Sequence, residues 1–329
     1  MQQYIGVDIS KRDFHACFTE NGQPIKFNND HQGIDTFLKY LSNNKYTKEE
    51  TVIGLESTGA YHLPLSILCS NQNYTVKVIN PLITKKQNQT DLRRVKNDRK
   101  DAHLIRYCLA NGEGYAFHET PNSLILKNLV RQRDYLSTIK RTFNTKQQDI
   151  TYKEQYIKNK ITSVNLELSQ FLEEKIKQLE KELKQHNPQS QKLLQSIPGV
   201  GPITAVSFIS EVGDINRFPT SKQLTAYIGI DPRTYESGTS IKGKGYITKR
   251  GNKILRTRLF NATSVAVLYP NQFQSFFQKK RSEGKPYRVA LVATMHKMTH
   301  VIYAVWKRGT PYIENRLIKQ EEKTQFLKR

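Results

Sequence analysis

Two carboxylates three residues apart lie within a strongly basic stretch of the chain. Asp98 and Asp101 would point to one spot on a helix, because residues at i and i+3 share a face. Acids this close repel each other unless a cation lies between them, and carboxylate oxygens are the ligands that Mg²⁺ prefers. The surrounding cations suit a phosphate substrate, and we predict that they contact nucleic acid: Arg93, Arg94, Lys96, Arg99 and Lys100.

The same spacing also fits a solvated helix face with ion pairs along it. A metal site is favoured over that alternative only if further carboxylates come from elsewhere in the chain. Asp8 lies near the end of one apolar run, and Glu56 directly follows another at residues 51–55. Ligands of partly parallel sheets bind at the carboxyl ends of the strands. If the two runs are neighbouring strands, both acids project into the same crevice.

The elements that would position these acids alternate between strand and helix. The Asn21–Gly22 step between two apolar runs is a strong hairpin signal, so an antiparallel trio of strands opens the chain. Later strand–helix–strand order implies a partly parallel sheet with right-handed crossovers. The expected strands are residues 4–9, 14–19, 24–27, 51–55 and 74–79, and the expected helices are residues 31–41 and 61–70.

Composition points to a polyanionic partner. The 329 residues include 52 Lys and Arg against 29 Asp and Glu, a formal net charge of +23 that favours nucleic acid before membrane. Apolar runs stay below the ~18 residues that span a bilayer, and the N-terminus does not resemble a signal peptide. The three cysteines show no CxxC spacing, which argues against a disulfide framework or a zinc site. We therefore expect a cytoplasmic protein.

The middle of the chain, residues 120–185, is polar and has a helical pattern without strand signals. Leu129, Leu136 and Phe143 recur at seven-residue spacing, and a second apolar series lies within residues 168–183. This narrow seam is typical of helices that pack in pairs. Two arrangements fit it: a helical hairpin within one chain, or a coiled coil that joins two chains.

The C-terminal half contains two candidate phosphate-binding features. Gly199 and Gly201 lie in the run 197–205, which resembles the hairpin of a helix-hairpin-helix module, although a plain turn fits too. After Glu236 the sequence has no acid until Glu283. This basic, glycine-containing run would neutralise phosphates, unless it is a disordered basic patch. The residues predicted to contact nucleic acid there are Lys242, Lys244, Lys249, Arg250, Lys253, Arg256 and Arg258.

Three segments of the N-terminal half resemble the DEDD domain of the insertion-sequence-110 family of transposases, which includes the pilin gene inverting recombinases. They are residues 4–11, 54–59 and 96–102. The resemblance implies a RuvC-type ribonuclease H fold. It also implies that a tetrad binds Mg²⁺, with Mn²⁺ as the alternative ion: Asp8, Glu56, Asp98 and Asp101.

The C-terminal half matches the same family. A Ser237–Gly238 step precedes the basic run, which passes through Lys249 to Asn252. The match implies that Ser237 is the nucleophile. Tyr235 and Tyr246 are rival nucleophiles in principle, but neither occupies the position that matches the family.

The resemblance implies a DNA transposase that cuts and rejoins donor and target DNA through a phosphoserine. A structured bridge RNA would guide it, and it would act as a homo-oligomer, a dimer of dimers in which the tetrad of one protomer meets the serine of another. The expected fold is α/β plus α in four segments: a RuvC-like DEDD domain (1–118), a helical coiled-coil linker (119–188), a mainly helical transposase domain with a helix-hairpin-helix (189–312) and a charged tail (313–329).

Two other classes of function remain open. A metal-dependent, structure-specific nuclease of the junction-resolvase kind would need the tetrad but would not need Ser237. A scaffold that only binds RNA or DNA would need neither. The serine-containing second half favours the recombinase.

Overall fold

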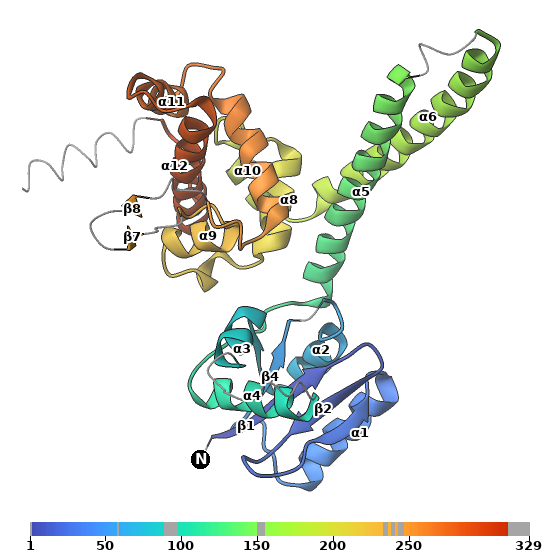
Figure 1. The fold of residues 1–329 in the computed structure, drawn as a ribbon, viewed down its shortest axis with the longest axis vertical. Coiled ribbons are helices and arrows are strands. Elements are labelled where there is room, and N and C mark those ends of the chain that lie inside the picture. Colours follow the sequence, from blue (N-terminus) through green and yellow to red (C-terminus); the bar gives the residue numbers. More distant parts are fainter. Residues whose placement is uncertain are drawn as a thin grey trace, which may run out of the picture. The chain divides into compact units, whose positions relative to one another are not determined.

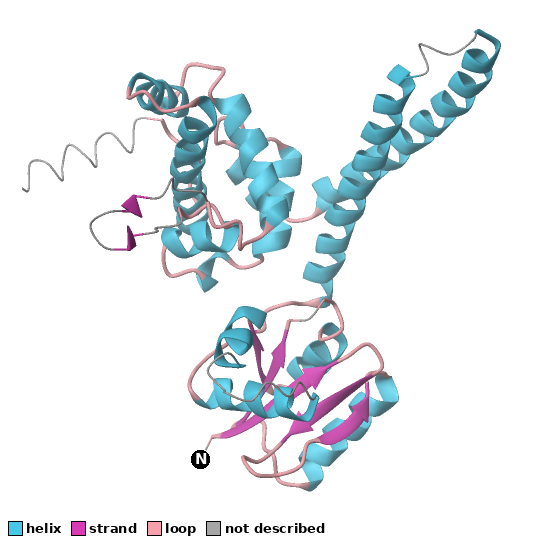
Figure 2. Cartoon of the chain, viewed as in Figure 1, coloured by secondary structure: helices cyan, strands magenta, loops and turns pink. Residues whose placement is uncertain are grey.

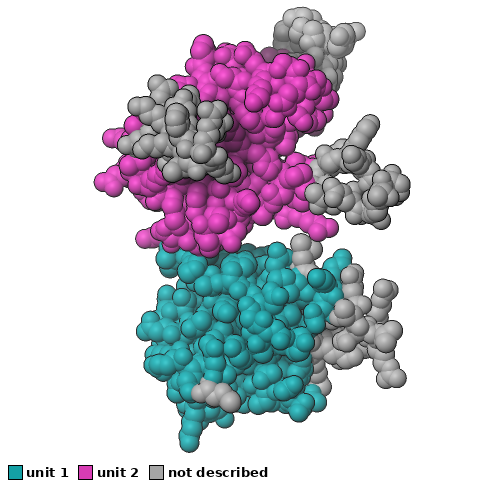
Figure 3. Space-filling model, turned by 90° about the vertical axis from the view of Figure 1, so that its left-hand side faces the viewer, with its two compact units in different colours: residues 1–121 teal, residues 122–329 magenta. Residues whose placement is uncertain are grey.

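The computed structural model describes residues 2–57, 59–88, 98–149, 155–232, 236–237, 241–242 and 247–314. The chain forms two compact units, Met1–Pro121 and Asn122–Arg329 (Figures 1 and 3). We refer to them as the first and the second unit. In the described parts of the chain, no helix has the length and apolarity needed to cross a membrane.

A six-stranded mixed sheet forms the centre of the first unit (Figure 2). Its order is β3-β2-β1-β4-β5-β6; β1, β4 and β5 run parallel, and the other strands pair antiparallel. The expected hairpin trio and parallel crossovers are therefore confirmed, and the short β6 is an addition. The strands are β1 (Gln3–Ile9), β2 (Asp13–Cys17), β3 (Ile25–Asn28), β4 (Thr51–Glu56), β5 (Thr75–Ile79) and β6 (Tyr115–Ala116).

Helices cover both faces of this sheet. One face packs on α1 (His31–Asn43) and α2 (Leu63–Asn71), where the main apolar core of the unit lies. The Asp30 side chain caps α1 by accepting a hydrogen bond from the Gly33 N–H at 2.7 Å. The other face carries α4 (Asp98–Ala110) over a smaller core, with α3 (Pro81–Asn88) beside it.

Two paired glycines let α4 lie directly on the sheet. Gly6 of β1 and Gly54 of β4 are register partners. A Cβ added at Gly6 would lie 2.3 Å from the carbonyl oxygen of Ala102, and one at Gly54 would lie 2.2 Å from Leu109 Cδ1. Both distances are far below van der Waals contact. The helix can therefore take its position only because these two residues lack a side chain.

The second unit begins with an arm of two long helices, α5 (Pro121–Asp149) and α6 (Gln155–Gln185). Arg133 of α5 pairs with Glu180 of α6 (Nε–Oε1 2.8 Å), and Lys140 pairs with Glu173 (Nζ–Oε2 2.8 Å). Hydrogen bonds from Lys140 and Lys177 lower the pKa of Glu173 to about 2. These contacts are those of a helical hairpin within one chain, and a coiled coil between chains stays a prediction.

The rest of the second unit is a helical bundle that shares its core with the base of the arm. Leu126, Val130 and Leu183 of the arm belong to the same buried cluster as the bundle helices. A domain boundary near residue 188 therefore stays a prediction. The elements are α7 (Pro188–Gln195), α8 (Pro202–Val212), α9 (Ser221–Ile228), β7 (Glu236–Ser237), β8 (Ile241–Lys242), α10 (Lys253–Ala266), α11 (Gln272–Ser282) and α12 (Tyr287–Arg308).

The contact between Gly6 and α4 yields a first prediction. Gly6→Ala forces the helix backbone away from β1, and overpacking of this kind costs about 1–3 kcal/mol. We expect a matching loss in the free energy of unfolding, measured by denaturant titration. Thr36→Ala, an exposed change on α1, is the control and should stay within about 0.5 kcal/mol of the parent. A Gly6→Ala protein as stable as this control would contradict the close-approach argument.

Candidate active site

Asp8 and Glu56 lie side by side at the carboxyl ends of β1 and β4. The parallel register pairs Gly6 with Gly54 and Val7 with Leu55, and these acids are the next residues on each strand. Because successive side chains point to opposite faces of a sheet, both acids lie on the face of the two glycines, which α4 covers. The expectation that β1 and β4 are neighbours is confirmed.

The Glu56 carboxylate is held by a residue that sequence reasoning missed. Thr84 of α3 donates a hydrogen bond from its hydroxyl to Glu56 Oε2 at 2.7 Å, and Thr84 itself is only 5% exposed. A polar side chain that orients a carboxylate in this way tunes the site that the carboxylate serves. Pro81, a favourable first helical residue directly after β5, is the signal that could have placed a helix here.

The helix α4, which contains the DxxD pair, covers the same face of the sheet. It begins at Asp98, and Asp101 is half-buried one residue before Ala102, whose carbonyl oxygen lies over Gly6. Gly6 precedes Asp8 by two residues on β1, so Asp101 lies one residue from the point where α4 contacts the strand that contains Asp8. The backbones of Arg99 and Lys100 belong to α4. The side chains of Asp98, Arg99 and Lys100, and the whole of Arg93, Arg94 and Lys96, lie outside what the structure describes.

A thiol–imidazole contact also holds α4 against the sheet. Cys17 Sγ of β2 lies 3.1 Å from His103 Nδ1, and Cys17 is the register partner of Gly6. Burial raises the pKa of the Cys17 thiol, which keeps it protonated at neutral pH. This contact joins β2 to α4 two residues after Asp101. Nothing in the sequence pattern singled it out, since both residues read as ordinary packing positions.

Asp8, Glu56 and Asp101 are all carboxylates, the type of ligand that a hard divalent cation prefers. Among the side chains that the structure describes, no three or more His, Cys, Asp or Glu residues are gathered closely enough to hold a metal ion. His296 and His300, a possible ligand pair by spacing, have protein partners instead. His296 Nε2 donates to the Ile230 carbonyl at 2.7 Å, and His300 Nδ1 lies 2.7 Å from Ser221 Oγ.

Ser237 lies on β7, which pairs antiparallel with β8 through Ser237 and Ile241. The loop that carries this strand pair closes at its base. The Thr248 N–H donates to the Asp231 carbonyl at 2.8 Å, and the Lys249 N–H donates to the Gly229 carbonyl at 3.0 Å. The side chains of Ser237 and Lys242, and all of Lys244, lie outside the described residues.

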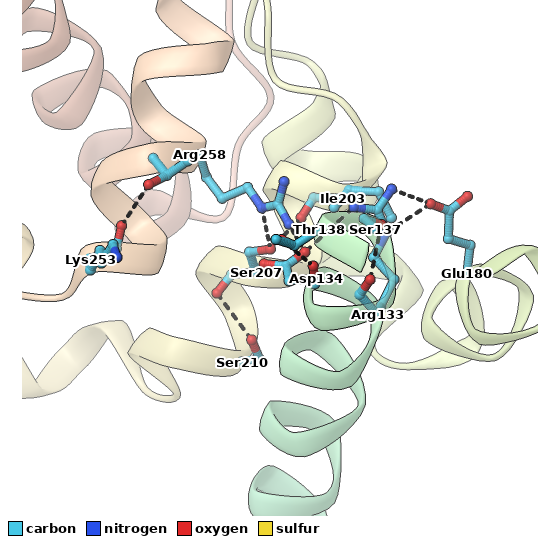
Figure 4. A network of polar contacts seen from close by, with 11 residues as sticks. Arg133, Asp134, Ser137, Thr138, Glu180, Ile203, Ser207, Ser210, Lys253 and Arg258 are labelled. Carbon is cyan, nitrogen blue, oxygen red and sulfur yellow. Dashed lines mark hydrogen bonds and ion pairs between the residues drawn. The ribbon is translucent and has the colours of Figure 1, made fainter. Parts of the chain in front are cut away.

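The predicted basic contacts of this region divide into two groups. Lys249, Arg250 and Lys253 are exposed to solvent. Arg256 instead donates from Nη1 to the Ile228 carbonyl at 2.9 Å. Arg258 donates from Nε to Ser207 Oγ at 3.2 Å and forms an ion pair with Asp134 (Figure 4). Both arginines of the second group thus have internal structural roles.

The two glycines of the proposed hairpin also differ. Gly199 has a φ of 84°, and a Cβ there would lie 2.2 Å from the Ala262 carbonyl oxygen, so close packing on α10 explains it. Gly201 caps the N-terminus of α8, and a Cβ there would meet nothing within 4 Å. Phosphate binding at this turn stays a prediction.

Comparison with known proteins agrees with this arrangement. A DEDD transposase model of the IS110 type matches residues 5–151, and the model of the transposase IS116/IS110/IS902 family matches residues 191–278. The pilin gene-inverting protein of Moraxella lacunata is 29% identical over 315 residues, which cover 94% of this chain and 97% of that protein. The corresponding protein of Moraxella bovis matches to the same extent.

A transposase for insertion sequence element IS1111A of Coxiella burnetii is 38% identical over 122 residues, covering 36% of this chain and 33% of that protein. The family models match both halves of the chain, and the pilin gene-inverting proteins match nearly all of it. The chain therefore belongs to the IS116/IS110/IS902 family of transposases and is an enzyme that cleaves and rejoins DNA.

Proposed function

We propose that this transposase recombines donor and target DNA through a phosphoserine at Ser237, with Asp8, Glu56, Asp98 and Asp101 as its divalent-metal site. The observation that carries the proposal is the register of β1 and β4. It sets two acids side by side beneath α4, the helix that contains the other two. A solvated helix face would not account for this arrangement.

The proposed chemistry needs both halves of the chain. The Ser237 oxygen forms a bond to phosphorus while the bond from phosphorus to the deoxyribose oxygen breaks. The serine hydroxyl loses its proton and the leaving oxygen gains one, which conserves one phosphodiester and permits the reverse attack that rejoins DNA. Mg²⁺ or Mn²⁺, when bound, would stabilise negative charge on the attacking and leaving oxygens. Asp8 and Glu56 would orient that ion, and Thr84 would orient Glu56.

The proposed partners follow from charge and from the family resemblance. A net charge of +23, with Lys249, Arg250 and Lys253 exposed next to the serine loop, suits nucleic-acid phosphates. We include a structured bridge RNA that pairs with donor and target DNA. We also include a dimer of dimers in which the carboxylates of one protomer act with Ser237 of another.

The hydrogen bond to Glu56 yields a prediction about metal dependence. Thr84→Val removes the donor at nearly constant volume, and loss of such an orienting contact lowers metal affinity or activity about 10–100-fold. DNA cleavage measured against Mg²⁺ concentration should shift its midpoint upward, whereas Thr84→Ser should behave as the parent. Glu56→Gln should abolish the response. Asp13→Asn is the control, since Asp13 pairs with Lys26 at 2.8 Å on β2. An unchanged midpoint in Thr84→Val would remove Thr84 from the site.

A second prediction separates the recombinase from a nuclease. With end-labelled DNA, Mg²⁺ and the RNA of the element, label should migrate with the protein on a denaturing gel. Ser237→Ala should reduce this adduct about 1000-fold or more, because no other group replaces a lost nucleophile efficiently. Tyr235→Phe and Tyr246→Phe should retain it. Free cut DNA that persists in Ser237→Ala and disappears in Asp101→Asn would favour a hydrolytic nuclease.

The exposed basic residues yield a third prediction. Each phosphate contact contributes about −0.9 to the slope of log K against log salt concentration for duplex DNA. Replacing Lys249, Arg250 and Lys253 by Ala should therefore make that slope shallower by about 2 to 3. A control that removes the same charge from the α1 region, Lys39, Lys45 and Lys48 to Ala, should leave the slope unchanged. If both triple variants changed the slope equally, the effect of Lys249, Arg250 and Lys253 would come from net charge and not from contacts with phosphates.

A further inference from the structure

The second unit contains a buried carboxylate that the proposed chemistry does not use. Glu211, near the end of α8, is 1% exposed. Arg131 of the arm helix α5 meets it with two hydrogen bonds, Nε to Oε1 at 2.9 Å and Nη2 to Oε2 at 3.0 Å. A third donor, Asn252 Nδ2, reaches Oε2 at 2.8 Å. This carboxylate therefore joins the arm to the residue that begins α10.

Asn252 lies at the base of the loop that carries Ser237. Its backbone N–H donates to the Tyr227 carbonyl at 2.8 Å, and its Oδ1 accepts from the Leu255 N–H at 3.0 Å, which caps α10. Tyr227 lies in the last turn of α9, on the other side of the loop, and its hydroxyl donates to the Glu211 backbone carbonyl at 2.9 Å. Both ends of the serine loop thus bond to one residue, Glu211.

The base of this loop leaves little room for adjustment. Gly229 has a φ of 79°, and a Cβ there would lie 2.5 Å from the Gly251 backbone nitrogen. Arg256 adds a hydrogen bond across the base, from Nη1 to the Ile228 carbonyl at 2.9 Å. Because the two ends of the loop meet in one closely packed base, displacement of Asn252 or Tyr227 would move both ends together.

A second ion pair joins the same turn of α5 to the bundle, and here α5 supplies the anion instead of the cation. Asp134, three residues after Arg131, pairs with Arg258 of α10, and Arg258 also donates to Ser207 of α8 (Figure 4). Residues three apart share a helix face. A cation and an anion on one face of α5 thus hold α8 and α10, and α10 directly follows the serine loop.

We propose that Glu211 is a positioning residue for Ser237, since it fixes the base of the serine loop to Arg131 and so lets the arm set the position of that loop. The inference rests on the proposed role of Ser237. The competing explanation is that the ion pair between the buried Glu211 and the half-exposed Arg131 stabilises the bundle and has no influence on the loop.

Paired substitutions separate the two explanations. Arg131→Met leaves the buried carboxylate without its cation, and breaking a buried pair in this way is strongly destabilising. Arg131→Met combined with Glu211→Gln removes both charges, and a neutral buried pair of similar volume is often tolerated. We therefore expect the unfolding midpoint to fall in Arg131→Met and to return close to the parent value in the double variant. Both Arg131→Met and the double variant lack the ion pair that joins the arm to Glu211.

Three measurements on the full-length protein test the inference at a temperature where every variant is folded. In the double variant, the adduct should form up to about 100-fold more slowly, because small misplacements of reacting groups have effects of that size. DNA affinity should stay within about twofold of the parent, because the double variant removes one cation and one anion and leaves the net charge unchanged. Hydrogen exchange at the Lys249 and Asn252 amides should be faster. Arg131→Lys, which keeps the cation, should lie between the parent and the double variant in adduct rate and in amide exchange.

Arg141→Met is the matched control, because it removes an exposed cation from the same helix. It should change none of these readouts. If the double variant forms adduct and exchanges amides as the parent does, adduct formation follows stability alone and the inference is wrong. Hydrogen exchange does not depend on the chemistry. If the parent protein forms no adduct, the proposed function fails, while the exchange data still decide whether Glu211 orders the loop.

Discussion

The close approach of α4 to the sheet is the constraint on which the first unit depends. Side chains of both elements normally separate the backbone of a helix from the sheet that it covers. Gly6 and Gly54 have no side chain where β1 and β4 pair, so α4 approaches the two strands more closely there. A helix this close can deliver short side chains such as aspartate to residues at the strand ends. The glycines, although chemically inert, therefore determine whether the acids can act together.

Carboxylates near the apolar cores have different surroundings in the two units. In the first unit, Asp8 and Glu56 lie at strand ends, and Glu56 accepts a hydrogen bond from the neutral hydroxyl of Thr84. In the second unit, Glu211 is fully enclosed, its charge is balanced by Arg131, and its oxygens accept from both Arg131 and Asn252. A carboxylate with three such donors has little tendency to bind a metal. The same residue type thus has a proposed catalytic role in one unit and a proposed positioning role in the other.

Much of the first unit could be predicted from the sequence because its signals are local. Apolar runs and the Asn21–Gly22 turn indicate the strands, and connection rules predict the antiparallel trio and the parallel crossovers. The adjacency of Asp8 and Glu56 was conditional on their two strands being neighbours, and the pairing of β1 with β4 fulfils that condition. Thr84 and the Cys17–His103 contact could not be predicted, because each joins residues far apart in the chain. Their positions depend on how α3 and α4 rest on the sheet, which no local pattern encodes.

The basic run of the second unit shows a further limit of sequence reasoning. Charge density alone assigned seven cations to nucleic acid, yet Arg256 and Arg258 lie between the buried Leu255 and Leu259 and turn their donors inward. Arginine is suited to such roles, because its planar group makes several directed hydrogen bonds. The exposed cations are mainly lysines, which act as point charges toward phosphate and carry no base information. A surface of this kind holds nucleic acid without selecting its sequence, so an enzyme built this way must take its target choice from elsewhere, as the proposed pairing by RNA provides.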